Sequence, residues 1–323
     1  MTFGIAVSPV TADDIVWRGD PGGRWDVREN WVGNEEPTAN DHAIINNGNW
    51  CKIKQDYAAA AQRITIATDN MLRMKSNSEL TLGDGDEQIS IVNGVFEIGQ
   101  PTCYNAVVKI SGDHTIQGSG GVIKLLGKAS KIEDNGEAGD ELTVESTVEC
   151  NEGSPPDDVD SLVVTGRGEI HVELFNNAYV VAGESASSGD PLKLKDDDKD
   201  SGCCGFWIVE DAGVLLVQAT VTGKGTWKAV DVTGDDVGGK FQIGENVNHT
   251  GCVAAEGDVF LKSGRGDEGS GAALQVIGYS YFCTTGSLEF KSIDIGESVT
   301  QPEIDVRLNA EAEFGGDCDS CSK

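Results

Sequence analysis

The feature of this sequence that most limits its fold is a short phrase that recurs along most of the chain. Each copy is a short run that alternates between apolar and polar residues and ends at a glycine. The copies end at Gly83, Gly99, Gly112, Gly127, Gly166, Gly183, Gly223, Gly234, Gly244, Gly278 and Gly296. A period of two residues is typical of a half-buried β-strand, and glycine favours the tight turn that follows it. The pattern predicts an all-β chain of many short strands.

The spacing of these copies distinguishes two all-β architectures. A β-sandwich or barrel shows turn signals about every 8–12 residues, whereas a β-solenoid coil needs about 20 residues for two or three short strands. Here the spacing is irregular, which favours a solenoid with loops of variable length. We therefore predict a right-handed parallel β-helix (a β-solenoid) with an N-terminal cap, and β-sandwiches are the alternative. The best helical candidate is the alanine run at residues 57–66, which leads straight into a strand.

Charge limits the partners of the chain. It has 54 acidic and 24 basic residues, which gives a formal net charge of -30. Such a charge repels nucleic acid and anionic lipid and attracts cations such as Ca²⁺. We therefore expect no nucleic-acid partner. No stretch approaches the roughly 18 apolar residues of a membrane helix, so no membrane span is expected either.

The nine cysteines are spread along the chain. Their spacing does not provide the two paired motifs of a structural zinc site, so disulfides are the expected use. Disulfides imply an oxidising compartment, and we expect a protein that is secreted or held at the cell surface. The odd count leaves at least one thiol for another use, such as a cross-link to a neighbouring subunit. The candidates are Cys203, Cys204, Cys318 and Cys321.

The order of these features divides the chain into a cap, a solenoid and a tail. The predicted parts are an N-terminal segment 1–12, a tryptophan-rich cap module 13–60, a solenoid 61–314 with polar inserts at 150–160 and 184–205, and a cysteine-containing tail 315–323. The N-terminal segment ends in small residues. It is interpreted either as the remnant of a secretory signal or as an N-terminal strand.

Half of the six tryptophans lie close together near the start of the chain, at Trp17, Trp25 and Trp31. A solenoid has two ends, and each exposes apolar core and unpaired backbone groups unless it is covered. A large aromatic side chain buries of order 150–250 Å². We therefore predict that the three tryptophans close the N-terminal end. The alternative is that they form the core of a small independent β-domain.

The same stretch resembles the N-terminal module of secreted bacterial β-helix proteins of the autotransporter-passenger-like and planctomycete surface types. The matching residues are Trp17, Gly19, Gly22, Gly23, Trp25, Asn30, Trp31, Pro37, Asp41, Ala43, Ile44 and Ile45. The segment ITIATDNMLRMKSNSELTLG, which follows, is similar to the strands that come after that module. The resemblance covers about the first 85 residues. It implies a parallel β-helix and an extracellular setting, and it implies no catalytic residues.

Two acidic loops are candidate calcium sites. Asp196, Asp198 and Asp200 place oxygen ligands at alternate positions, as in calcium-binding loops that begin Asp-x-Asp-x-Asp-Gly. The fit is partial, because the glycine is displaced by one position and the usual glutamate ligand is missing. Asp84 and Asp86 form the second candidate. A solvated acidic loop is the alternative at each site.

The sequence shows no catalytic constellation. A β-helix hydrolase needs paired carboxylates on one strand face, and a lyase needs a basic residue beside Ca²⁺. The four histidines, His42, His114, His171 and His249, lack such neighbours in the sequence and are expected to be surface or turn residues. We predict a non-enzymatic, self-associating extracellular structural protein of a surface layer, matrix or filament. The alternatives are a polysaccharide lyase or hydrolase and a carbohydrate-binding adhesin.

Overall fold

The computed structural model describes the N-terminal two thirds of the chain in most detail. Side chains are described for residues 12–83, 88–101, 105–136, 139–147, 160–183, 190–202, 204–210, 213–219 and 221. Beyond residue 221 the description covers the backbone of strands β24 to β33. The described residues are nearly all in strands and turns, and the 3-10 turn η1 (Arg28–Asn30) is the helical element among them.

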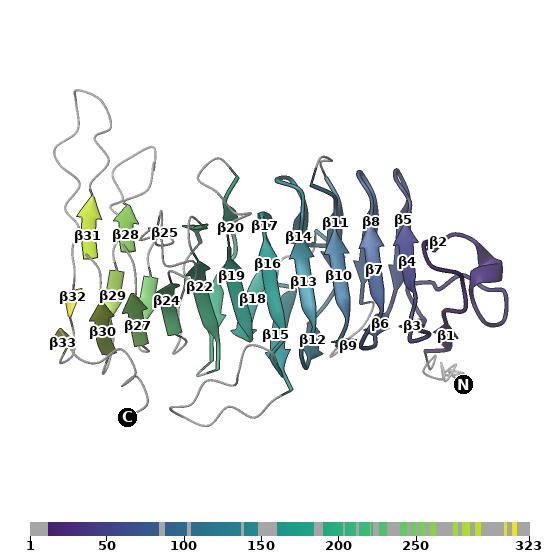
Figure 1. Cartoon of the computed structure of the whole chain (residues 1–323), viewed down its shortest axis with the longest axis horizontal. Helices are drawn as coiled ribbons and strands as arrows, with labels where there is room; N and C mark the ends of the chain where they lie inside the picture. The colour runs from purple at the N-terminus through teal and green to yellow at the C-terminus, as the bar shows by residue number, and fades with distance from the viewer. Residues whose placement is uncertain are drawn as a thin grey trace, which may run out of the picture.

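Three parallel sheets form the body of the molecule (Figure 1). Sheet I consists of β1 (Asp14–Val16), β3 (His42–Ile45), β6 (Arg63–Ile66), β9 (Gln88–Val92), β12 (His114–Gly118), β15 (Glu141–Ser146), β18 (Glu173–Asn177) and β21 (Lys199–Ser201). Sheet II consists of β2 (Gly23–Arg24), β4 (Trp50–Ile53), β7 (Met71–Met74), β10 (Val95–Ile98), β13 (Val122–Leu125), β16 (Val163–Gly166), β19 (Tyr179–Ala182), β22 (Phe206–Glu210), β24 (Thr226–Val230), β27 (Cys252–Ala255), β30 (Ser280–Thr284) and β33 (Ala312–Phe314).

Sheet III and two short sheets complete the set. Sheet III consists of β5 (Ala58–Ala61), β8 (Glu79–Leu82), β11 (Val107–Ile110), β14 (Lys131–Asp134), β17 (Gly168–Ile170), β20 (Leu192–Lys195), β23 (Val214–Gln218) and β25 (Lys240–Ile243). The short sheets are β26 (Val247–His249), β29 (Leu274–Val276) and β32 (Arg307–Leu308), and the pair β28 (Val259–Lys262) and β31 (Leu288–Lys291).

From β3 to β23 the chain visits sheets I, II and III in turn, so three consecutive strands make one coil. Each strand pairs in parallel with the equivalent strand of the next coil, as Ala43 with Ile64 in sheet I and Leu80 with Val108 in sheet III. Figure 1 shows the resulting stack of coils along the long axis. The predicted parallel β-helix is therefore confirmed.

Coil length varies along the stack. The step between paired residues of sheet II is 21 residues from Cys51 to Leu72 and 41 residues from Ile123 to Val164. The irregular spacing of the strand-plus-glycine phrases follows from this variation. The predicted insert at 150–160 belongs to the longest of these steps, and all but its last residue lies outside the described residues.

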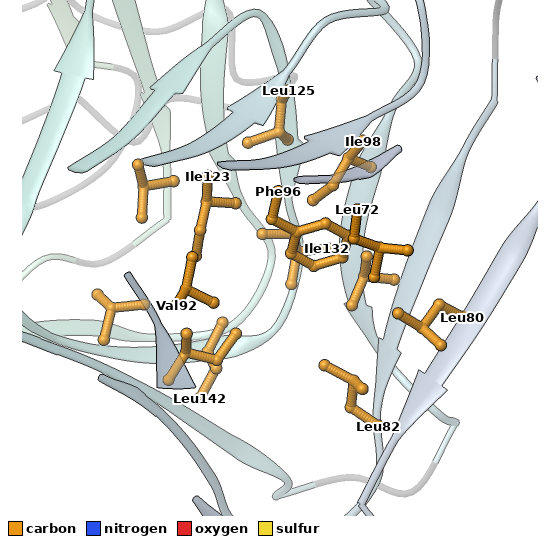
Figure 2. Packing of buried hydrophobic residues seen from close by; sticks show 14 of the residues in the cluster. Leu72, Leu80, Leu82, Val92, Phe96, Ile98, Ile123, Leu125, Ile132 and Leu142 are labelled. Carbon is orange, nitrogen blue, oxygen red and sulfur yellow. The ribbon is translucent and has the colours of Figure 1, made fainter. Parts of the chain in front are cut away.

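The core is the inside of the coils. Inward-facing side chains stack on their equivalents in the next coil, and Figure 2 shows Leu72, Phe96 and Ile123 among residues that point into this interior. These three side chains are fully buried. Alternation along each strand puts one apolar residue inward and its neighbour outward, which is the pattern that the sequence displays.

Two local predictions are wrong. The segment at 57–66 is not a helix, because it forms β5 and β6 with a corner between them. Ala59, Ala61, Ile64 and Ile66 alternate inward and are buried, so coil packing overrides the helical preference of alanine. The predicted polar insert at 184–205 contains β20 and β21, and the inward Leu192 and Leu194 of β20 belong to the core.

The three N-terminal tryptophans close the end of this core. Trp31 packs edge-on against Trp17 and Trp25, with ring centroids 5.0 and 4.8 Å apart, and all three side chains are at most 1% exposed. The Trp31 indole N–H donates to the Trp25 carbonyl at 2.7 Å. All three belong to the same continuous cluster as the coil residues as far as Val221, so they extend the solenoid core and do not form a separate domain.

The segment that carries these tryptophans hydrogen-bonds to the ends of β1 and β2. Asn30 and Val32 bond the outer edge of β1 in the antiparallel sense, through Arg18 N–H to Asn30 and Val32 N–H to Val16, both at 2.8 Å. At β2 the Arg24 carbonyl accepts a bond from the Asn30 side chain at 2.9 Å. The predicted cap module at 13–60 also includes the first full coil, β3 to β5, except for Ala61 at the end of β5.

Candidate functional site

A polar groove lies at the carboxyl ends of four neighbouring strands of sheet III. Strands β11, β14, β17 and β20 are parallel, so their last residues meet at one edge of the sheet. The groove has a volume of about 480 Å³. It is lined by Lys109, Glu133, Asp134, Asn135, Gly136, His171, Asp196 and Asp197. Residues that are far apart in the sequence therefore share one surface because of coil stacking.

His171 is held between two carboxylates in this groove. Its Nδ1 lies 2.6 Å from Oδ2 of Asp196, and its Nε2 lies 2.8 Å from Oε2 of Glu169. An ionised carboxylate can only accept hydrogen bonds, so both contacts are satisfied when the imidazole carries a proton on each nitrogen. The ring is thereby fixed in orientation at the edge of the groove.

Glu169 is the centre of a network of cations. Its carboxylate accepts a bond from Lys193 at 2.7 Å, and Lys195 Nζ lies 3.6 Å from the same oxygen. Burial opposes ionisation of this carboxyl, but the hydrogen bonds from Lys193 and His171 outweigh it and lower the pKa of Glu169 to about 2. Glu169 is therefore an anchor for His171 that stays charged near neutral pH.

The acidic turn that follows β20 is held from inside by a buried lysine. Lys199 is fully buried, and its Nζ donates to the carbonyl of Lys195 at 2.9 Å and to the carbonyl of Asp197. Burial lowers the pKa of Lys199 to about 8, against the opposing effect of Asp197 and Asp196. An ammonium thus lies beneath the turn and compensates part of its negative charge.

This arrangement bears on the predicted calcium ligands. All three candidate ligands, Asp196, Asp198 and Asp200, are exposed, and the Asp196 carboxylate contacts His171. Across the residues whose side chains are described, no cluster of three His, Cys, Asp or Glu could hold a metal ion. Calcium binding at this turn therefore stays a prediction. The second candidate, Asp84 with Asp86, lies outside the described residues.

The cysteines are described in part. Cys204 is disulfide-bonded. Cys203, Cys318 and Cys321 lie outside the described residues, so a cross-link to a neighbouring subunit stays a prediction. Cys51 is free and fully buried in β4, where burial raises the pKa of its thiol well above the ordinary value.

The sequence expectation that the histidines are surface or turn residues is wrong for His114. His171 belongs to the groove, and His114 lies in the core at 1% exposure, where its Nε2 is 2.8 Å from Ser90 Oγ. Burial lowers the pKa of His114 to about 4, so it is neutral at physiological pH. The partner of His171 that the sequence could have indicated is Glu169, because residues two apart on a strand share a face. Asp196 could be found only once the coil register is known.

The chemistry available in the groove is that of acids and bases. Glu133 and Asp134 come from the end of β14, and Asp196 and Asp197 come from the turn after β20, two coils away. Carboxyl groups on two sides of a groove, beside a fixed imidazole, are the group types that general acid–base catalysis uses. The same groups also accept hydrogen bonds from the hydroxyls of a bound sugar.

Comparison with known proteins adds no relative to this picture. Within the part of the chain that the structure describes, no helix is long and apolar enough to cross a membrane. The chain matches no protein-family model, no curated protein and no solved structure.

Proposed function

We propose that this chain is a structural rod of an extracellular surface layer, matrix or filament, and that it self-associates there. The observation that carries the proposal is the continuous core, which runs without a break from Trp17 to Val221 through one stack of coils. Such a stack resists bending, because every coil is bonded to its neighbours along three sheets. The fold therefore forms a stiff rod of defined length.

That length can be estimated from the strand order. Sheet II has 12 strands, and neighbouring strands lie about 4.8 Å apart, so the described stack spans roughly 50 Å. At the N-terminal end, the last residues of β1 and β2, Val16 and Arg24, already accept hydrogen bonds from within the chain. We expect self-association to use the sides of the rod or cysteine cross-links, and not strand addition at that end.

Negative-stain electron microscopy tests the proposal, with size-exclusion chromatography and light scattering on the same samples. Filaments or ordered arrays that disappear with reductant would support cross-linked assembly. The double variant Cys318→Ser/Cys321→Ser is expected to remove the cross-linked species. Cys51→Ala is the control, because its thiol is buried and cannot reach another molecule. Isolated rods under all conditions and at all concentrations would contradict self-association.

A polysaccharide hydrolase is the second candidate, because the sheet III groove brings four carboxylates and His171 together. Reducing-sugar and unsaturated-product assays over a polysaccharide panel test it. If the groove is catalytic, Asp134→Asn and Asp196→Asn abolish product formation. Asp113→Asn, on an exposed turn outside the groove, does not. No product from any polymer, or product that survives both groove variants, would remove this candidate.

A further inference from the structure

The outer face of sheet II carries a row of basic side chains, although the chain as a whole has a net charge of -30. The register of β2, β4, β7, β10 and β13 places one residue of each strand in a single line across the sheet. The line, which we call the basic row, consists of Arg24, Lys52, Arg73, Glu97 and Lys124. Four of its five members are cations.

The ion pairs of this face leave some of its charge uncompensated. Arg73 pairs with Glu97, which is the acidic member of the row. Arg24 pairs with Asp26, which also accepts Lys54 at 2.5 Å. Lys52 and Lys124 form no ion pair with a described carboxylate. The face therefore keeps an excess of positive charge, and its two unpaired lysines are three strand steps apart, about 14 Å.

An apolar line runs beside the basic row. It is formed by the residues two positions before the last four members of the row, which are Trp50, Met71, Val95 and Val122, and it continues at Val163. These side chains are partly exposed on the flat outer surface. At the N-terminal end of the line the Trp50 ring is covered by the Arg73 guanidinium, 5.1 Å from its centroid. Figure 1 shows β4, β7, β10 and β13 side by side on the face toward the viewer.

We propose that this face binds a linear acidic polysaccharide, a polymer of uronic acids, along the basic row. Carboxylates at regular intervals along such a polymer meet cations that repeat with the strand spacing. The C–H faces of the sugar rings pack against Met71, Val95 and Val122. Attraction at this face persists in an acidic protein because exposed charges on the other faces are screened beyond about 10 Å at 0.1 M salt.

The chemistry of the face favours this ligand over a nucleic acid. Single-stranded nucleic acids are held by aromatic side chains on which bases stack. The aromatic ring of the apolar line, Trp50, is already in contact with Arg73 and Lys52. The inference goes beyond the proposed structural role and does not require assembly, because a monomeric rod presents the same face.

Titration calorimetry in about 0.1 M salt, where the charges on the other faces are screened, tests the inference with polygalacturonate as the probe. Its fully methyl-esterified form has the same backbone without the charges and is expected to bind at least tenfold more weakly. The double variant Lys52→Gln/Lys124→Gln is expected to lose about five- to tenfold in affinity, since two partly exposed charge contacts are removed. Lys128→Gln/Lys131→Gln removes the same charge elsewhere and is expected to bind like the wild type.

Several outcomes would overturn the inference. These are equal affinity for the esterified polymer, an unchanged affinity of the Lys52 and Lys124 variant, or an equal loss in the control. Tighter binding of single-stranded DNA than of polygalacturonate would assign the face to nucleic acid. Loss of self-association in the Lys52 and Lys124 variant, without binding of the polymer, would assign it to a second copy. Asp134→Asn, in the sheet III groove, should leave polymer affinity unchanged if the site is on sheet II.

Discussion

Replacing the buried lysine beneath the acidic turn should change how stability depends on pH. The pKa of Lys199 falls from 10.5 to about 8 in the folded protein. Between these two values the unfolded chain holds a proton that the folded chain has released. Stability therefore rises with pH across this window. One pKa unit corresponds to about 1.4 kcal/mol, so the wild type should gain about 2 kcal/mol from this residue between about pH 7.5 and 9.5.

Lys199→Met removes this gain. Methionine fills a similar volume and cannot titrate, although it leaves the Lys195 and Asp197 carbonyls without their donor. The variant should be less stable at neutral pH for that reason, and its stability should lack the rise with pH. Lys128→Met, at an exposed position, is the control that keeps the wild-type slope.

The assay is urea unfolding at pH 7.5 and 9.5, followed by tryptophan fluorescence. The quantity to compare is the change in unfolding free energy between the two pH values, with the urea dependence checked for constancy. Other groups that titrate in this range contribute equally to wild type and variant, so they cancel in the difference. Equal pH slopes for wild type and Lys199→Met would show that the ammonium is not held as described.

Three further changes test the cap, the groove and the coil spacing. Trp31→Ala should lower the free energy of unfolding by urea by about 3–5 kcal/mol, because it leaves a cavity at a fully buried site. Trp50→Ala, on the outer face, should lower it much less. Similar losses for the two variants would contradict the closing role of Trp31. Glu169 has a lowered pKa, so its contribution to stability is present above about pH 4.5 and is lost as pH falls toward 2. Glu169→Gln should therefore reduce the loss of stability in this pH range, measured by circular dichroism. An unchanged loss would argue against the ion pairs of Glu169. Gly121→Ala would place a Cβ 1.8 Å from the Val92 carbonyl oxygen, so we expect a sharply lower yield of folded protein on expression. A normal yield would mean that the backbones of the two coils are farther apart at this point.

The fold could be predicted from the sequence because its main signal is local. Alternation of inward and outward residues, as in the strand that ends before Gly83, repeats in every coil and needs no knowledge of distant contacts. The tryptophan cluster was informative for a similar reason, since Trp17, Trp25 and Trp31 are close in sequence as well as in space. The alanine run in β5 was misleading, because alanine fits both a helix and a narrow inward position.

The groove and the basic row could not be predicted, because both depend on register between coils. His171 and Asp196 are 25 residues apart, and Lys52 and Lys124 are joined through three pairings of different length. Irregular steps between coils hide such alignments, and a shift of one residue would turn each outward side chain inward. The burial of Lys199 beneath the acidic turn could not be predicted either, because a lysine within a run of aspartates is expected to be exposed to solvent.

The closed N-terminal end has a consequence for how the protein reaches its native state. A chain leaving the ribosome exposes this end first, and stacked coils depend on contacts with their immediate neighbours. Once Trp31 covers the first coil, each later coil can pair with the strands of the coil before it, so folding can proceed in the order of synthesis. Damage to the cap should therefore delay the appearance of all later coils, and the delay should be seen in refolding rates even where the final stability recovers.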